Sequence, residues 1–298
     1  MFAVVGTVPV HDFPLTAGPI SFSGQSLVIE GHSIAVNRGT PALLAAALKI
    51  CAFCGAPPPF AYLVGDIGTG AGSRKLYAHL ETDLPSRRFE GLTFHYIQPD
   101  VDWHNRVMLA TEKMTSRPAL IADAGFMYAA KMSGYADFYD VFTPDAGELA
   151  FLADESAPHP FYTRGFIFHE SNRVPELITR AYRHGNAARY LLVKGEADVL
   201  ADADGISQTV AEPLVPALEP IGGTGDILTG LLSALIGMGH DIPAACCYAA
   251  RISRMAGKLA RPDPGTQVID IIARIPESAA FIFSSEKNNN HIKKEIYR

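Results

Sequence analysis

The sequence has few cysteines, little charge and no long apolar run, and each shortage excludes a class of protein. Four of the 298 residues are cysteines, and 19% of all residues are charged. No apolar run reaches the roughly 18 residues of a membrane-spanning helix. The net charge of -6 argues against broad nucleic-acid binding, which needs a basic face. With 48% hydrophobic residues, the chain has ample material for a core, so overall disorder is not expected.

The cysteines and histidines form no pattern that predicts a metal site. Cys51 and Cys54 have C-x-x-C spacing, but the other two, Cys246 and Cys247, are adjacent. A zinc site needs a second spaced pair or histidines at ligand spacing. Both pairs fall within apolar helical patterns, so we expect buried, reduced thiols. We assign no role to any of the ten histidines.

The N-terminus does not read as a secretion signal. Residues 1–6 lack a charged start and a long apolar stretch. We therefore expect a cytoplasmic protein. We also expect a small-molecule substrate, no membrane or nucleic-acid partner, and a homo-oligomeric state.

Strand and helix patterns alternate along most of the chain, in units of roughly 25 to 30 residues. This alternation predicts one α/β domain over residues 1–283, with a mainly parallel central sheet and helices on both faces. Residues 26–29 and 32–36 read as further strands, and residues 199–206 as an antiparallel hairpin. We expect a helix over residues 268–275 and a polar, frayed C-terminal tail over residues 284–298.

A glycine-rich turn opens an apolar helix near residue 224. Gly222, Gly223, Thr224 and Gly225 precede Asp226. Backbone N–H groups at a helix start lack intrahelical partners and attract anions such as phosphate. A carboxylate beside bound phosphate suggests a base that takes a proton from an attacking hydroxyl. The alternative is that Asp226 only caps the helix.

Polar residues at strand ends are the next candidates, because ligands of open α/β sheets bind there. Asp123 follows the strand over residues 119–122 and could bind magnesium, a sugar hydroxyl or its own turn. Lys194, followed by Gly195, comes after the strand over residues 190–193. It could meet phosphate oxygens or be a solvated surface lysine.

The segment from Thr143 to Glu148 also follows a strand. Asp145 would face the cleft beyond the sheet. Glu148 falls in the first turn of a helix, where it could satisfy the helix dipole or reach magnesium through water. A further glycine-rich segment over residues 65–72 does not match the dinucleotide-binding spacing, so we expect a loop that lines the cleft.

In this order and spacing, the motifs resemble the ribokinase-like superfamily, in particular its ADP/ATP-dependent NAD(P)H-hydrate dehydratase branch. The resemblance covers roughly residues 33–276 and includes Gly39-Thr40-Pro41 before an alanine-rich helix. Asp145 stands where that family usually has a histidine. Arg251 and Arg254 stand where it tends to have a His-Gly pair.

The resemblance implies a three-layer α/β/α fold and ATP or ADP, with Mg²⁺, as the phosphoryl source. It implies Asp226 as catalytic base, and Lys194, Gly195 and the 222–225 turn as nucleotide- and phosphate-binding residues. Substrate contacts would come from Asn37, Gly39, Asp123 and Asp145, and a water-mediated metal contact from Glu148. The acceptor would be a small hydroxyl compound, either an NAD(P)H hydrate or a sugar or vitamin-like alcohol. A non-catalytic nucleotide-binding protein is the remaining alternative.

Overall fold

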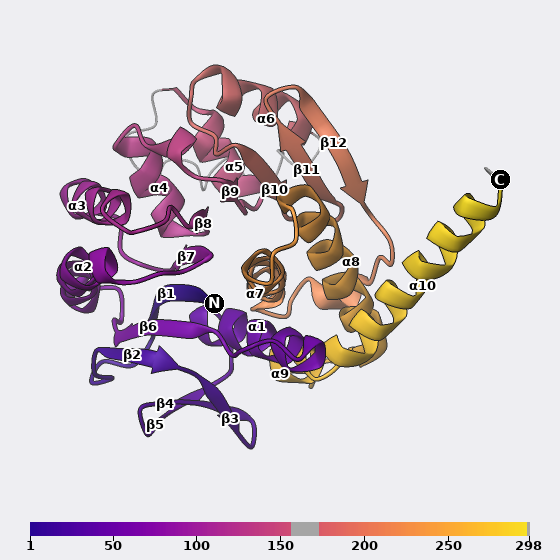
Figure 1. The fold of residues 1–298 in the computed structure, drawn as a ribbon, viewed down its shortest axis with the longest axis horizontal. Helices are drawn as coiled ribbons and strands as arrows, with labels where there is room; N and C mark the ends of the chain where they lie inside the picture. Colours follow the sequence, from indigo (N-terminus) through magenta and orange to yellow (C-terminus); the bar gives the residue numbers. More distant parts are fainter. Residues whose placement is uncertain (156–172, 297–298) are drawn as a thin grey trace.

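The computed structural model describes residues 1–155 and 173–296 (Figure 1). Three short 3₁₀ helices, Leu84–Ser86, Ala136–Phe138 and Pro216–Leu218, join longer elements. In chain order these are β1 (Phe2–Val8), β2 (Thr16–Pro19), β3 (Ser21–Ser23), β4 (Ser26–Ile29), β5 (His32–Ala35), α1 (Thr40–Cys54), β6 (Phe60–Gly65), α2 (Ala71–Asp83), β7 (Gly91–His95), α3 (Val101–Glu112), β8 (Ala119–Ala122), α4 (Gly125–Met132), β9 (Val141–Phe142), α5 (Ala146–Ala153), α6 (Val174–Arg183), β10 (Tyr190–Val193), β11 (Asp198–Asp202), β12 (Gly205–Val210), α7 (Thr224–Gly237), α8 (Ile242–Ala260), α9 (Val268–Ile272) and α10 (Ile275–Ile296).

The central sheet has nine strands in the order β12-β11-β10-β9-β8-β7-β1-β6-β2. All neighbours from β10 to β6 are parallel. The antiparallel hairpin β11–β12 extends one edge, and β2 pairs antiparallel with β6 at the other. The predicted parallel sheet and the hairpin are therefore confirmed, whereas β2 was not predicted.

Helices cover both faces of this sheet, which confirms the three-layer arrangement. Helices α2, α3 and α4 lie on one side, and α1, α7 and α8 on the other (Figure 1). Each side has its own apolar core. The interior strand β1, third from the β2 edge, is buried along its whole length because both of its faces are covered.

Close packing of α1 against α7 brings their first turns together. A Cβ added to Gly230 of α7 would lie 2.2 Å from the Leu43 carbonyl oxygen of α1. Only glycine allows so close an approach. This contact places the start of α7, with Asp226, beside Gly39 at the start of α1.

The strands over residues 26–29 and 32–36 are present as β4 and β5. Together with β3, which pairs with β4, they form a separate antiparallel sheet, called here the small sheet, which extends from the β2 edge (Figure 1).

The C-terminal region differs from the prediction in two ways. The helix expected over residues 268–275 is two helices, because α9 ends at Ile272 and α10 starts anew at Ile275, with Pro276 in its first turn. The predicted frayed tail is wrong as far as residue 296, since α10 continues through it. No glycine or proline interrupts residues 277–296.

The four cysteines, all of them among the described residues, form no disulfide bond. Cys51 and Cys246 are buried as predicted, but Cys54 is exposed. Among residues 1–155 and 173–296, no helix combines the length and apolar character needed to cross a membrane.

Candidate active site

Four polar side chains meet at the carboxyl ends of neighbouring parallel strands. His95 is the last residue of β7, and Asp123 follows β8. Thr143 and Lys194 directly follow β9 and β10. His95, Asp123 and Thr143 are buried, and the Lys194 side chain is only 14% exposed. They lie beside the first turns of α7. His95 contacts Asp226, Asp123 and Thr143 contact Thr229, and Lys194 lies beside Gly225.

The glycine-rich turn leads directly into α7, which begins at Thr224. Gly223, the N-cap residue, has a φ of 103°, and no side chain caps the helix. A Cβ on Gly223 would lie 2.8 Å from a Val268 methyl group, and one on Gly225 would lie 3.4 Å from Lys194 Cδ. Gly223 therefore favours glycine, both for its positive φ and for its contact with Val268, whereas Gly225 lies in ordinary contact distance of the Lys194 side chain. The first N–H groups of α7 have no acceptor within the helix, which leaves donors for an anion.

Asp226 is buried and reaches out of its own helix. Its Oδ2 accepts a hydrogen bond from the Gly39 N–H at 2.5 Å, and its Oδ1 lies 3.1 Å from His95 Nε2. Burial alone would raise the pKa of Asp226. The His95 hydrogen bond and charge and the nearby Lys194 outweigh burial, so that pKa lies below its ordinary value. Asp226 is therefore ionised at neutral pH, and its hydrogen bonds do not cap α7.

Lys194 is bound to Asp123 and is not a solvated surface lysine. Its Nζ lies 2.8 Å and 3.0 Å from the two carboxylate oxygens of Asp123. Burial opposes the charge on Lys194, but Asp123 and Glu148 hold its pKa above the ordinary value. The Thr229 hydroxyl of α7 donates to Asp123 Oδ2 at 2.6 Å. An ammonium has three donors, so Lys194 retains one beyond the two that bind Asp123.

Gly195 lies in a turn that a buried ion pair supports. Arg254 Nε lies 2.7 Å from Asp198 Oδ2, and Arg254 Nη2 donates to the Gly195 carbonyl oxygen at 2.9 Å. The Gly195 N–H points to Asp198 Oδ1 at 3.4 Å. These contacts hold the backbone that follows Lys194, which gives Gly195 a structural role beside its predicted phosphate-binding role.

Asp145 and Glu148 form a capping box at the start of α5. Asp145 Oδ1 accepts from the Glu148 N–H, and Glu148 Oε2 accepts from the Asp145 N–H, both at 2.8 Å. The Asp145 carboxylate therefore already serves the helix. Burial, with smaller effects of Asp123 and Asp145, raises the pKa of Glu148 to about 8.

A metal ion would need ligands beyond the protein side chains seen here. Within the part of the chain that the structure describes, no three His, Cys, Asp or Glu side chains are grouped to hold a metal ion. Mg²⁺ is commonly held by one or two carboxylates together with substrate phosphates. Glu148 and Asp123 have the donor chemistry for such a shared site.

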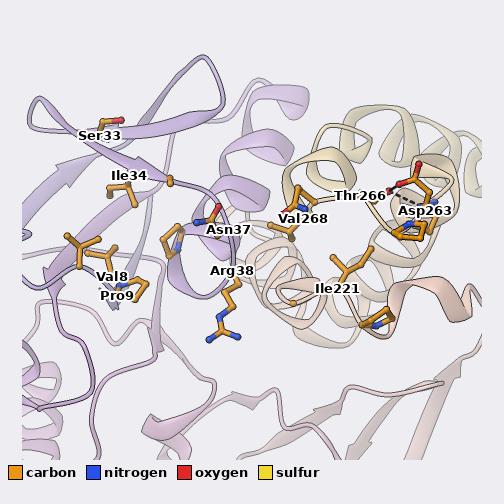
Figure 2. Close-up of a pocket in the computed structure, with 18 of the residues that line it drawn as sticks. Val8, Pro9, Ser33, Ile34, Asn37, Arg38, Ile221, Asp263, Thr266 and Val268 are labelled. Carbon is orange, nitrogen blue, oxygen red and sulfur yellow. Dashed lines mark hydrogen bonds between the residues drawn. The ribbon is translucent and has the colours of Figure 1, made fainter.

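A cavity of about 890 Å³ adjoins the turn before α7. It lies between the small sheet and the loop between α8 and α9. Figure 2 shows Asn37 and Arg38 between Ile34 of the small sheet and Ile221 of the turn. Of the predicted site residues, Asn37 and Gly222 line this cavity, while the side chains around Asp226 do not.

The glycine-rich segment over residues 65–72 lines a second cavity, of about 310 Å³. Its backbone wraps around a carboxylate, because Asp66 accepts hydrogen bonds from the N–H groups of Gly68, Gly70 and Ser73. The loop is thus occupied by its own aspartate, and its cavity is separate from the larger one.

Two residues of this site were missed in the sequence. His95 was assigned no role, although its position at a strand end is the signal that singled out Asp123. Thr229 lies one helical turn after Gly225 and gave no signal of its own, because its partner Asp123 is 106 residues away in sequence.

The fold and the site define a ribokinase-like protein. The structure is similar to a ribokinase-like superfamily protein of Enterococcus faecalis V583, with a TM-score of 0.56 and 13% identity over 94% of this chain and 86% of that chain. It is also similar to the ADP/ATP-dependent NAD(P)H-hydrate dehydratase of Bacillus subtilis, co-crystallized with ATP/Mg²⁺ (TM-score 0.54, 17% identity, 93% and 89% coverage). At these identities the likeness shows the fold.

The chain belongs to the NAD(P)H-hydrate dehydratase family, whose profile matches residues 98–276. It is 40% identical over 218 residues to an uncharacterized protein of Methanocaldococcus jannaschii, covering 72% of this chain and 88% of that protein. It is 30% identical over 169 residues to the bifunctional NAD(P)H-hydrate repair enzyme Nnr of Pyrobaculum aerophilum, covering 55% of this chain and 30% of that enzyme. The family prediction is confirmed, and the family is one of ADP/ATP-dependent enzymes.

Proposed function

We propose that this protein transfers a phosphoryl group from ATP or ADP to the hydroxyl of a small molecule, with hydrated NAD(P)H as the first candidate acceptor. The observation that carries the proposal is the place of Asp226. Its ionised carboxylate lies at the start of α7, beside unpaired helix N–H groups and within the electrostatic reach of Lys194. A site that only bound nucleotide would gain nothing from a carboxylate next to phosphate, which argues against a non-catalytic role.

Each group would have one task in this reaction. Asp226 would take the proton of the acceptor hydroxyl. The oxygen of that hydroxyl would bond to phosphorus while the nucleotide leaves with the bridging oxygen. The N–H groups of Gly223, Thr224 and Gly225 would stabilise the negative charge on the transferred group. Lys194, whose side chain lies beside Gly225, would add a positive charge next to the transferred group.

The residues present fit a nucleotide and its metal. Gly222 lines one end of the 890 Å³ cavity. A nucleotide bound in this cavity would place its phosphates toward the 222–225 turn. Mg²⁺, held through water by Glu148, would neutralise phosphate charge when bound. Asn37 and Gly39 remain proposed acceptor contacts. Asp145 would contact the acceptor only through the part of its carboxylate that the capping box leaves free. We also retain the expectation of a cytoplasmic homo-oligomer.

The direct test is incubation of the protein with ATP or ADP, Mg²⁺ and hydrated NADH, following the return of NADH absorbance. NADH would return because the phosphorylated hydrate loses phosphate, together with a proton of the ring. We expect recovery with the wild type and a loss of about 10²- to 10⁴-fold in kcat for Asp226→Asn, which cannot act as base. Asp241→Asn is the matched control, because Asp241 is an exposed N-cap of the next helix, α8. Full turnover by Asp226→Asn would remove Asp226 from the chemistry.

A second candidate is a kinase for a sugar or vitamin-like alcohol. The family profile starts at residue 98, so the small sheet and Gly39 lie outside the matched segment although the small sheet borders the large cavity. The family match therefore assigns nothing to the proposed acceptor contacts Asn37 and Gly39. Phosphorylation of such an alcohol without recovery of NADH would favour this candidate over the hydrate.

A further inference from the structure

A buried histidine contacts the proposed base. His95 is 0% exposed at the end of β7. Its Nε2 lies 3.1 Å from Asp226 Oδ1 and 3.8 Å from Asp123 Oδ2. The shorter distance assigns the hydrogen bond to Asp226, and the contact with Asp123 is only electrostatic. His95 lies before residue 98, where the family profile begins, so the family match assigns it nothing.

The other side of the ring is held by α1. His95 Nδ1 lies 3.0 Å from the Thr40 hydroxyl oxygen, and Thr40 is fully buried. Thr40 can occupy this place only because Gly6 has no side chain, since a Cβ there would lie 2.5 Å from Thr40 Oγ1. Strand β1 and helix α1 thus leave one orientation for the imidazole, with Nε2 toward Asp226.

One proton position follows from the partner. An ionised carboxylate can only accept hydrogen bonds, so Nε2 carries the proton that points to Asp226. Nδ1 lies within hydrogen-bond distance of the Thr40 hydroxyl, so both ring nitrogens have a partner. His95 therefore links Thr40 to Asp226.

We propose that His95 is a positioning residue for Asp226, holding one carboxylate oxygen while the Gly39 N–H holds the other. The proposal rests on the proposed role of Asp226 as base. With Oδ1 and Oδ2 each bound from outside α7, the carboxylate has one orientation relative to the start of the helix. Each oxygen keeps a lone pair for the acceptor hydroxyl. The charged and titratable groups around this unit are Asp123, Lys194 and the Tyr96 phenol.

The test compares His95→Ala and His95→Gln, since glutamine restores an N–H donor. We expect His95→Ala to lower kcat about 10²-fold, as misplacement of a reacting group does, with the nucleotide KM within about twofold of wild type. The acidic limb of the kcat–pH profile should move to higher pH, because Asp226 loses a hydrogen bond that favours its ionised form. His95→Gln should recover much of kcat.

Two comparisons separate positioning from folding. His104→Gln removes another fully buried histidine, bound to Tyr139 on the opposite face of the sheet. It should lower Tm and leave the pH profile unchanged. In the double variant His95→Ala/Asp226→Asn, kcat should equal that of Asp226→Asn, because residues that act as one unit are not additive. Additive losses, or a His95→Ala variant with wild-type kcat and pH profile, would overturn the proposal.

A readout that does not need turnover distinguishes this proposal from the proposed function. We expect the ¹⁵Nε2 resonance of His95 to shift in Asp226→Asn and to keep its wild-type position in Asp241→Asn. If phosphoryl transfer is not observed but this shift is present, the proposed function is contradicted and the His95–Asp226 contact is still supported. Absence of the shift would refute the contact itself.

Discussion

The buried ion pair between Lys194 and Asp123 makes a sharp stability prediction. Replacing Lys194 by Met leaves the Asp123 carboxylate, whose side chain is 2% exposed, without its cation. Removing one partner of a buried pair costs about 3–5 kcal/mol. Asp123 keeps its hydrogen bonds from Thr229 and the Ala124 N–H, so we place Lys194→Met at the lower end, about 3 kcal/mol.

A double-mutant cycle isolates this term. Asp123→Asn/Lys194→Met contains no unpaired charge, so it should be more stable than Lys194→Met alone, with a coupling of about 2 kcal/mol. Arg106→Met is the matched control, because the Arg106–Asp102 pair is 47% and 75% exposed. That exposed pair should cost under about 1 kcal/mol.

Chemical denaturation followed by fluorescence measures the stability of Lys194→Met, Asp123→Asn, their double variant and Arg106→Met. The single tryptophan of the sequence, Trp103, packs parallel to Tyr77 between α3 and α2 and reports unfolding. Equal costs for Lys194→Met and Arg106→Met, or additive single costs in the cycle, would refute the buried-pair reasoning. The double variant should regain stability without regaining turnover, because the proposed phosphate contact needs the ammonium.

Three further predictions follow from the backbone and from one carboxyl group. Ala124 has a φ of 51° and a ψ of -137°, a region that glycine favours, so Ala124→Gly should stabilise the fold by about 1–3 kcal/mol in a thermal melt. Gly223→Ala and Gly239→Ala both meet a positive φ, but only the former also meets Val268 at 2.8 Å. Gly223→Ala should therefore lower Tm more than Gly239→Ala does. The pKa of Glu148 is about 8 in the folded protein and 4.5 ordinarily. Between pH 4.5 and pH 8, the folded state therefore binds one more proton at Glu148 than the unfolded state does. Wild-type stability should therefore fall as pH rises through that window. Glu148→Gln keeps the capping box, and its Tm relative to wild type should increase from about pH 5 to about pH 9.

Each of these has a clear contrary outcome. An Ala124→Gly variant with lower Tm would show that the strained backbone costs less than the freedom glycine adds to the unfolded chain. Equal melting temperatures for the two glycine variants would mean that Val268 moves aside. A Tm difference for Glu148→Gln that does not vary with pH would place the pKa of Glu148 near its ordinary value.

Local sequence was enough for the features that depend on neighbouring residues. The turn before Asp226 needs only glycines and a helix start, and the parallel sheet follows from the alternation of strands and helices. The capping box was also readable, because Asp145 and Glu148 have its three-residue spacing. The Asp145 carboxylate caps α5, and the substrate role that the resemblance implied for it stays a prediction. The helix through residues 284–296 was missed because a polar composition was read as a frayed tail.

The partners of the proposed base came only from the tertiary structure. Gly39, His95 and Asp226 are far apart in sequence, and no local pattern marks a backbone N–H or a lone histidine as the partner of an acid. They meet because Gly230 lets α7 approach α1 and because Gly6 leaves room for Thr40. Lys194 is a similar case. Its place at a strand end was expected, but its bond to Asp123 forms because the carboxyl ends of β8 and β10 lie on the same side of the sheet. Backbone approach and sheet order are long-range properties of the packed chain, so they decide which side chains meet, while the local sequence decides which side chains are available.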